Sequence, residues 1–236
     1  MARGREKVKD EHIPLGRQKA SRLLNGIVPA LRGAVRGEKA PSVTEISQST
    51  RSPFKVLVST VISARTKDEV TAAASARLFA RAPDPKKLAR LSEKEIAKII
   101  YPAGFFRTKA RNLRALARKL VSDFGGDVPG SIDELLTLPG VGRKTANLVV
   151  TLAFGDYGIC VDTHVHRIVN RLGVVKTSNP EQTEFALREV LRKEHWIEIN
   201  DLLVMFGKKI CTPVSPRCSV CPIEEKCMKV GVERTR

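Results

Sequence analysis

Aromatic residues, acidic residues and long apolar runs are all scarce in this 236-residue chain. Aromatic residues make up only 5% of it, which argues against a base-stacking platform for single-stranded nucleic acid. No stretch approaches the roughly 20 apolar residues that a membrane-spanning helix requires, so no membrane partner is expected. The first residues are charged and lack the apolar stretch of a signal peptide, which predicts a cytoplasmic protein.

The shortage of acidic residues leaves a large positive charge on the chain. Lysine and arginine number 42 against 25 acidic residues, giving a formal net charge of +17 and a pI of about 10.1. The basic residues are spread over the whole chain, whereas a membrane-surface protein usually concentrates them on one amphipathic helix. This distribution favours nucleic acid as the partner and a nucleoid-associated location. Repulsion between such charged chains favours a monomer.

Strand-like alternation is nearly absent, while helical spacing recurs along the chain, so we predict an all-α protein of about ten short helices. Ser52 before Pro53 is typical of a helix N-cap and first helical position. Ser92 and Glu95 predict a capping box that opens a helix through Ile100. Residues 1–20 are charged and aperiodic, which predicts a flexible basic N-terminal arm. Further helices are predicted over residues 21–36, 68–81, 107–123, 132–138, 143–153, 163–172, 180–194 and 197–210.

Four of the five cysteines, Cys211, Cys218, Cys221 and Cys227, lie within the last 26 residues. Structural disulfides are rare in the cytosol, and four converging thiolates require a strong common ligand to repay the lost chain entropy. Zinc ribbons usually present two close Cys-x2-Cys pairs, whereas this segment has one such pair between two single cysteines. The spacing therefore favours an iron–sulfur cluster and leaves a structural zinc ion as the alternative. Cys160, outside this segment, is expected to be buried.

The segment LPGVGRKTA, residues 138–146, joins two predicted helices. Gly140 and Gly142, on either side of Val141, permit positive φ and keep side chains off the loop surface. The helix that follows presents backbone N–H groups at its N-terminus, with Arg143 beside them. The segment lacks the spacing of a nucleotide-binding P-loop. It is either an ordinary tight turn or a seat for a DNA phosphate, and the charge of the chain favours the phosphate.

Lys144, which follows Arg143, is a candidate nucleophile, because a neutral lysine amine forms Schiff bases. In the segment VDTHVHR, Asp162 directly precedes a predicted helix. An N-cap role explains it, and a carboxylate near a nucleophilic amine can also shuttle protons or stabilise a sugar cation. His164 and His166 do not share a helix face, so we expect them to be structural or in contact with DNA rather than bound to a metal.

These three motifs, LPGVGRKTA, VDTHVHR and C-x6-C-x2-C-x5-C, occur in an order and spacing that resemble the endonuclease III family of the helix–hairpin–helix DNA glycosylase superfamily. The resemblance runs from about Ser52 to Cys227. It implies a base-excision-repair enzyme, a bifunctional DNA glycosylase and apurinic/apyrimidinic lyase that removes oxidised pyrimidines from duplex DNA. It also implies a [4Fe–4S] cluster on the four cysteines. The implied architecture is a six-helix barrel at residues 46–156, and a cluster domain joining residues 21–45 to 157–236, with a DNA cleft between them.

The resemblance also assigns roles by position. Lys144 is implied to be the Schiff-base nucleophile and Asp162 the catalytic aspartate. A lysine at this position separates the chain from the adenine-specific and thymine-mismatch branches of the superfamily. Two alternatives stay open: a monofunctional glycosylase of the same superfamily, or a non-enzymatic DNA-binding protein with a structural metal.

Three positions depart from the bacterial pattern of this family. Arg65 stands where a glutamine usually fills the gap left by the flipped base. Phe105 stands where a leucine wedge is usual, and phenylalanine can also intercalate as an apolar wedge. The segment between the first two cluster cysteines has one basic residue, Arg217, so we expect it to contact the phosphates together with Lys208 and Lys209.

Overall fold

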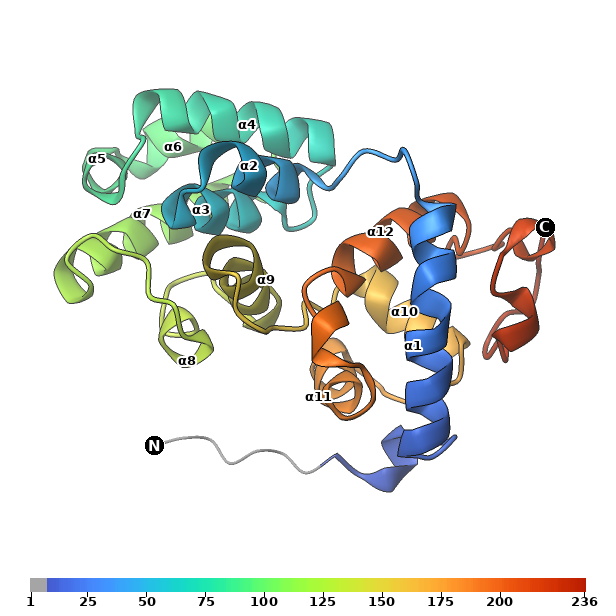
Figure 1. Ribbon diagram of the computed structural model, residues 1–236. Coiled ribbons are helices and arrows are strands. Elements are labelled where there is room, and N and C mark those ends of the chain that lie inside the picture. Colours follow the sequence, from blue (N-terminus) through green and yellow to red (C-terminus); the bar gives the residue numbers. More distant parts are fainter. Residues whose placement is uncertain (1–7) are drawn as a thin grey trace. The chain divides into compact units, whose positions relative to one another are not determined.

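A computed structural model describes the chain from residue 8 to residue 236 (Figure 1); the start of the predicted N-terminal arm, residues 1–7, lies outside the described residues. Between residues 8 and 236 the chain contains helices and turns but no strand, so the all-α prediction is confirmed. It divides into two compact units: Ala40–Gly158, which is continuous, and a unit that joins the residues up to Lys39 to Ile159–Arg236. The sequence predicts domain boundaries between residues 45 and 46 and between residues 156 and 157.

A series of helices builds the continuous unit: α2 (Ser42–Thr50), α3 (Pro53–Ser63), α4 (Asp68–Arg81), α5 (Pro85–Arg90), α6 (Glu93–Ile100), α7 (Phe106–Asp123), α8 (Ile132–Leu135) and α9 (Arg143–Phe154). Helix α3 is its centre and contacts α2, α4, α7 and α9. All residues from Val56 to Ile62 are buried, which requires cover on every side of the helix. The buried hydroxyls of Ser59 and Thr60 donate to backbone carbonyls one turn earlier, at 2.6 and 2.7 Å. Their burial therefore leaves no hydroxyl unpaired.

The helix-start signals predicted from the sequence are confirmed in this unit. The Ser52 hydroxyl accepts the backbone N–H of Lys55 at 3.4 Å, with Pro53 at the first helical position. The Ser92 hydroxyl accepts the backbone N–H of Glu95 at 3.2 Å, and the Glu95 carboxylate accepts that of Ser92 at 2.7 Å. Helix α4 has the predicted bounds. Two short helices, α2 and α5, are absent from the sequence prediction.

Both ends of the described chain contribute helices to the other unit: α1 (Arg17–Ala34), α10 (Thr163–Arg171), α11 (Pro180–Val190) and α12 (Ile199–Lys209). Helix α1 contacts α11 and α12, and α10 contacts α11 and α12. Leu24, Ile27 and Leu31 lie along one face of α1 and are fully buried in the shared apolar core. Burying this face stabilises the unit by about 2 kcal/mol for each large aliphatic side chain. Helix α1 is thus held mainly by residues far away in the sequence.

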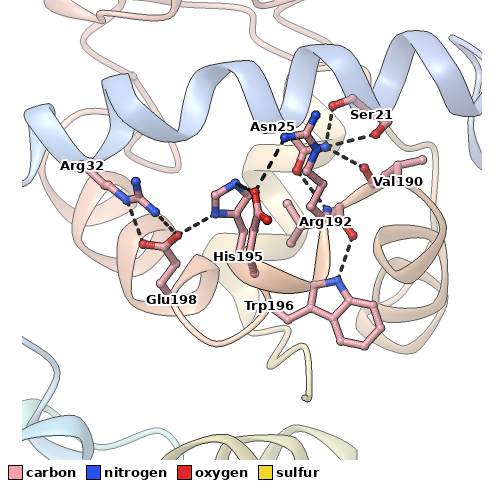
Figure 2. A network of polar contacts seen from close by, with 10 residues as sticks. Ser21, Asn25, Arg32, Val190, Arg192, His195, Trp196 and Glu198 are labelled. Carbon is pink, nitrogen blue, oxygen red and sulfur yellow. Dashed lines mark hydrogen bonds and ion pairs between the residues drawn. The ribbon is translucent and has the colours of Figure 1, made fainter. Parts of the chain in front are cut away.

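Polar contacts tie α1 to the last residue of α11 and to the segment that follows it (Figure 2). The Asn25 amide donates to the carbonyl of Val190 at 3.0 Å and accepts the backbone N–H of Arg192 at 2.9 Å. Near the other end of α1, the Arg32 guanidinium makes a two-point contact with the Glu198 carboxylate, at 3.0 and 2.6 Å. These contacts fix the position of α1 along its length.

The chain just before α1 is folded. A 3-10 turn spans Asp10–His12, and Ile13 is buried in the same apolar core. The carbonyl of His12 accepts the backbone N–H of Lys176 at 2.9 Å. Residues 8–20 therefore belong to the folded unit, unlike the prediction of a flexible arm up to residue 20, because apolar residues among the charged ones reach the core.

Candidate active site and DNA interface

The predicted hairpin lies between α8 and α9 in the continuous unit. The backbone N–H of Val141 donates to the carbonyl of Leu138 at 3.1 Å, which closes the turn. Gly140 has a φ of 78°, and a Cβ built there would lie 2.8 Å from the amide nitrogen of Asn112 on α7. Glycine is therefore required at this position for both backbone and steric reasons. Gly142, the N-cap of α9, has a φ of −102° and faces open space.

Lys144 is the second residue of α9, which begins at Arg143 as predicted. Its side chain is exposed, and the neighbouring Arg143 is half-buried, while residues 146–151 of the same helix are buried. The buried part anchors the helix, and its N-terminal backbone N–H groups and dipole favour an anion beside the hairpin. An amine presented in this way can reach a bound substrate from a rigid element.

The structure brings together Arg65 and Phe105, which are 40 positions apart in the sequence. The guanidinium carbon of Arg65 lies 5.4 Å from the centre of the Phe105 ring. Both residues have positive φ, and Phe105 is 62% exposed. The loops approach closely, since a Cβ on Gly104 would lie 2.3 Å from the carbonyl oxygen of Arg65. The two predicted DNA-probing residues therefore form a single exposed cation–aromatic pair.

Asp162, in the other unit, is the N-cap of α10. Its Oδ1 accepts the backbone N–H groups of His164 at 2.8 Å and Val165 at 2.9 Å. The preceding residues Cys160 and Val161 are buried, as predicted for the cysteine, and hold this carboxylate in place. Both of these capping hydrogen bonds end on Oδ1, so the second carboxylate oxygen, Oδ2, is not used by the cap.

The two histidines after Asp162 have different surroundings. His164 is half-buried against α12, where a Cβ on Gly207 would lie 2.5 Å from its Nδ1. Its Nδ1 also lies 3.2 Å from a guanidinium nitrogen of Arg167. His166 lies 2.7 Å from the Thr183 hydroxyl, and burial lowers the pKa of its imidazole. His166 is therefore structural, and DNA contact by His164 stays a prediction.

Four cysteines, Cys211, Cys218, Cys221 and Cys227, line one cavity at the end of this unit. Apolar side chains form much of its wall, and burial raises the pKa of the Cys221 thiol to about 11. The buried Arg171 donates to the sulfur of Cys211 at 3.4 Å, and the backbone N–H of Lys229 donates to that of Cys227 at 3.4 Å. Burial raises the pKa of the Cys218, Cys221 and Cys227 thiols, and a bound cationic group would offset this effect and favour their thiolates.

The two candidate metal groups place different requirements on the four sulfurs. A tetrahedral zinc ion, with Zn–S bonds of about 2.3 Å, requires sulfurs about 3.8 Å apart. Among residues 8–236, no three His, Cys, Asp or Glu side chains come close enough to hold one metal ion. A [4Fe–4S] cluster takes one thiolate on each of its four irons. Four thiols that line one cavity fit this donor set, and the choice between the cluster and zinc stays a prediction.

Arg217 and the nearby lysines were predicted to contact phosphates. The Arg217 side chain is exposed, and its backbone N–H donates to the carbonyl of Ile210 at 2.9 Å, which fixes the loop. Lys209 forms an ion pair with Glu38 at 2.6 Å. An existing anionic partner weakens the case for Lys209 as a phosphate contact and leaves Arg217 as the better candidate.

Lys109 on α7 is a buried charged residue that the sequence analysis missed; it lies beside the loops that carry Arg65 and Phe105. The overlooked signal is its spacing from Leu113, Leu116 and Leu120, which places a lysine on the apolar face of a basic amphipathic helix.

Comparison with known proteins places these features in a family. Residues 58–193, which contain the hairpin, Lys144 and Asp162, match the HhH-GPD superfamily base excision DNA repair protein model. The chain therefore belongs to the HhH-GPD superfamily of base excision DNA repair proteins. It is 47% identical over 175 residues to endonuclease III of Thermotoga maritima, covering 74% of this chain and 82% of that protein.

Further relatives agree with this placement. The chain is 45% identical over 183 residues to the chloroplastic endonuclease III homolog 1 of Arabidopsis thaliana, covering 74% of this chain and 48% of that protein. It thus spans about half the length of that plant relative. A solved structure of a trapped endonuclease III–DNA covalent intermediate matches with a TM-score of 0.80 and 32% identity, covering 89% of this chain and 96% of that one. None of the helices within residues 8–236 has the length and apolar character needed to cross a membrane.

Proposed function

We propose that this protein is a bifunctional DNA glycosylase and apurinic/apyrimidinic lyase that removes oxidised pyrimidines from duplex DNA in base excision repair. The observation that carries the proposal is the position of Lys144, an exposed residue at the start of α9, directly after the glycine hairpin. The net charge of +17 supports a DNA partner, and the proposed place of action is the nucleoid. The same charge favours a monomer.

In the proposed reaction, the damaged nucleotide is flipped out of the duplex. The Lys144 amine attacks the sugar C1′, and the bond from C1′ to the base breaks, so the base leaves with the bonding electrons and takes up a proton. The nitrogen gives up one proton, and the C1′–O4′ bond then breaks as the nitrogen lone pair forms the C=N bond of a protonated Schiff base between Lys144 and C1′. The ring oxygen keeps the electrons of the broken bond and takes up a proton. The Schiff base makes the C2′ proton acidic, and its removal expels the 3′ phosphate by breaking the C3′–O bond. The strand is thereby cut on the 3′ side of the lesion.

Asp162 is the proposed second catalytic residue. Its Oδ1 accepts two backbone N–H groups of α10, which fixes the position of the carboxylate. An ionised carboxylate can accept and return a proton and stabilise positive charge that develops on the sugar. The fixed position matters because proton transfer depends on the distance between donor and acceptor.

The proposed DNA contacts divide into phosphate and base contacts. The backbone of Gly140, Val141 and Gly142, with Arg143, binds a phosphate, and Arg217 binds a second one. Phe105 enters the base stack as a wedge, and Arg65 fills the space left by the flipped base. His164 is proposed to line the DNA surface as well.

The proposed cofactor is a [4Fe–4S] cluster held by Cys211, Cys218, Cys221 and Cys227. When bound, the cluster supplies a covalent cross-link for residues 211–227 and a one-electron redox centre. Arg171 and the backbone N–H of Lys229 supply hydrogen bonds to its sulfur ligands. The bonds broken at the sugar involve Lys144 and Asp162 alone. Iron and sulfide in the purified protein, with visible absorbance, would support this cofactor; colourless protein with stoichiometric zinc would reject it.

Borohydride trapping tests the proposed chemistry. A duplex with one thymine glycol is mixed with the native protein, with Lys144→Gln and with the control Lys119→Gln, which removes a lysine from α7. We expect a covalent protein–DNA adduct for the native protein and the control, and none for Lys144→Gln. Lys144→Gln should still bind DNA, because it removes one of 42 basic residues.

Other outcomes would redirect the proposal. Tight binding by the native protein without an adduct would reject the lyase step. Base removal without strand cleavage would then identify a monofunctional glycosylase, and the absence of both would identify a DNA-binding protein without chemistry. Loss of binding in Lys144→Gln would make Lys144 mainly a phosphate contact.

A further inference from the structure

Lys109 is a charged residue in the core of the continuous unit. Its residue surface is only 6% exposed. Its ammonium donates to the carbonyls of Ile62 at 2.6 Å and Ala64 at 2.5 Å, and to the hydroxyl of Thr66 at 2.8 Å. Three acceptors use all three N–H bonds of the ammonium, so only the charged form satisfies them together. Burial of the charge is unfavourable and lowers the pKa of Lys109 to about 8.

These contacts connect the two loops that carry the exposed cation–aromatic pair. Ala64 and Thr66 flank Arg65 in the loop after α3. The Thr66 hydroxyl also accepts the backbone N–H of Gly104, at 3.1 Å, in the loop before α7. Phe105 follows Gly104 directly. A single chain of hydrogen bonds therefore runs from Lys109 through Thr66 to the backbone beside Phe105.

Arg65 and Phe105 need such support because both are held in an unfavourable backbone conformation, with φ of 52° and 55°. The left-handed conformation is unfavourable for a non-glycine residue, so the surrounding structure must fix it. An apolar side chain at position 109 would fill the space without the cost of burying a charge, but it could not hold the two loops. The arrangement gives this buried charge a role beyond packing.

We propose that Lys109 is a positioning residue for lesion recognition, which holds Arg65 and Phe105 in the arrangement that enters duplex DNA. The inference rests on the proposed function, in which these two residues fill and wedge the base stack. Lys109 does not contact the reacting atoms, so its removal should impair recognition in the duplex more than the chemistry at the sugar. A lesion in single-stranded DNA has no opposite base and no gap to fill, and it needs neither residue.

The experiment compares two substrates, a duplex with one thymine glycol and a single-stranded oligonucleotide with one abasic site. Lys109→Met keeps the length of the side chain and removes its donors. The control is Lys119→Met, at a half-buried lysine of the same helix that pairs with Asp123. We expect kcat/KM for Lys109→Met to fall at least about tenfold on the duplex, because recognition depends on positioning within about 1 Å. Cleavage of the single-stranded abasic substrate should stay within about twofold, since Lys144 is unaffected. The control should resemble the native protein on both substrates.

A second variant keeps the test decisive if Lys109→Met does not fold. Thr66→Val removes only the hydroxyl that links Lys109 to Gly104, and it should show the same selective loss on the duplex. Equal losses on both substrates, or no loss for Thr66→Val, would overturn the inference. Failure of the proposed lyase function can be told apart from failure of the inference about Lys109. In the first case the native protein itself would leave the abasic substrate uncut.

Discussion

Arg65 and Phe105 face each other across two loops, with the guanidinium carbon 5.4 Å from the centre of the ring. The aromatic face attracts the cation, so each side chain restricts the other before DNA is present. A preorganised wedge and gap-filling residue lose less conformational entropy on binding than two independent side chains. Arg65 and Phe105 both depart from the bacterial pattern, which has glutamine and leucine at these positions. Their contact explains how the two departures can occur together, because the Phe105 ring supplies a partner for the Arg65 guanidinium.

A double-mutant cycle on the folded protein can test this pairing. Arg65→Ala and Phe105→Ala should show a coupling free energy of about 0.5–1 kcal/mol, the range of an exposed cation–π contact. Urea unfolding of the two single variants and the double variant measures it. Additive effects would mean that the two side chains are neighbours without mutual stabilisation.

The two hairpin glycines should respond differently to alanine. Gly140→Ala should destabilise the fold by at least about 1 kcal/mol, since φ is positive and the new Cβ would meet Asn112. Gly142→Ala should leave the free energy of unfolding nearly unchanged and weaken DNA binding, because its Cβ would occupy the open space that a phosphate approaches. Thermal melts and binding titrations separate the two effects. Unchanged binding in Gly142→Ala would argue against a phosphate at the hairpin.

Substitutions of Asp162 can separate capping from chemistry. Asp162→Asn keeps an acceptor oxygen for the N–H groups of His164 and Val165, so stability should change by less than about 1 kcal/mol. Turnover should fall by about 10²–10⁴-fold, because an amide cannot exchange the proton. Asp162→Ala should lose both functions. An active, stable Asp162→Asn protein would leave Asp162 as a helix cap only.

DNA binding should weaken steeply with salt, with a log–log slope near −0.9 for each phosphate contacted. Arg217→Ala should make the slope shallower by about one such unit, because its guanidinium is exposed on the loop between cluster cysteines. Lys209→Ala is the matched comparison, and its slope should change less, since Lys209 is paired with Glu38. A native protein whose affinity hardly responds to salt would contradict the charge argument.

Lys109 should give the native protein a distinctive pH dependence. Burial lowers its pKa from the ordinary value of 10.5 to about 8, so the unfolded chain binds more protons between these values. The free energy of unfolding of the native protein, relative to Lys109→Met, should therefore rise as the pH increases from about 8 to about 10.5 and stay level below that range. Urea titrations of both proteins at pH 7, 9 and 10 measure the difference. A constant difference would mean that the charge is not buried in solution.

Local signals made much of the fold predictable. The capping box of Ser92 and Glu95 and the N-cap at Asp162 depend on neighbours in the sequence, and both helices start where they were predicted. Helix α2 was missed because serine and threonine, which compete for backbone hydrogen bonds, make up much of it. Helix α5 was missed because its six residues are too few to show a period.

The site was predictable only where motifs carry its chemistry. The hairpin, Asp162 and the four cysteines each stand in a recognisable spacing. The pairing of Arg65 with Phe105 depends on two loops meeting, which no local pattern encodes. Lys109 shows the same limit, because its three acceptors are backbone and hydroxyl oxygens 43 to 47 positions away.

The placement of α1 has a consequence for the order in which the chain folds during synthesis. The partners of α1, helices α11 and α12, begin about 145 residues after α1 ends. At ribosomal rates of 5–20 residues per second, the apolar face of α1 waits on the order of 10 s for them, while the continuous unit, complete at Gly158, can already form. During that interval Leu24, Ile27 and Leu31 lack the apolar core that buries them in the folded unit. Assembly of the discontinuous unit is thus a late event, and a ribosome that stalls before α10 would release a chain in which only one of the two units has its full sequence.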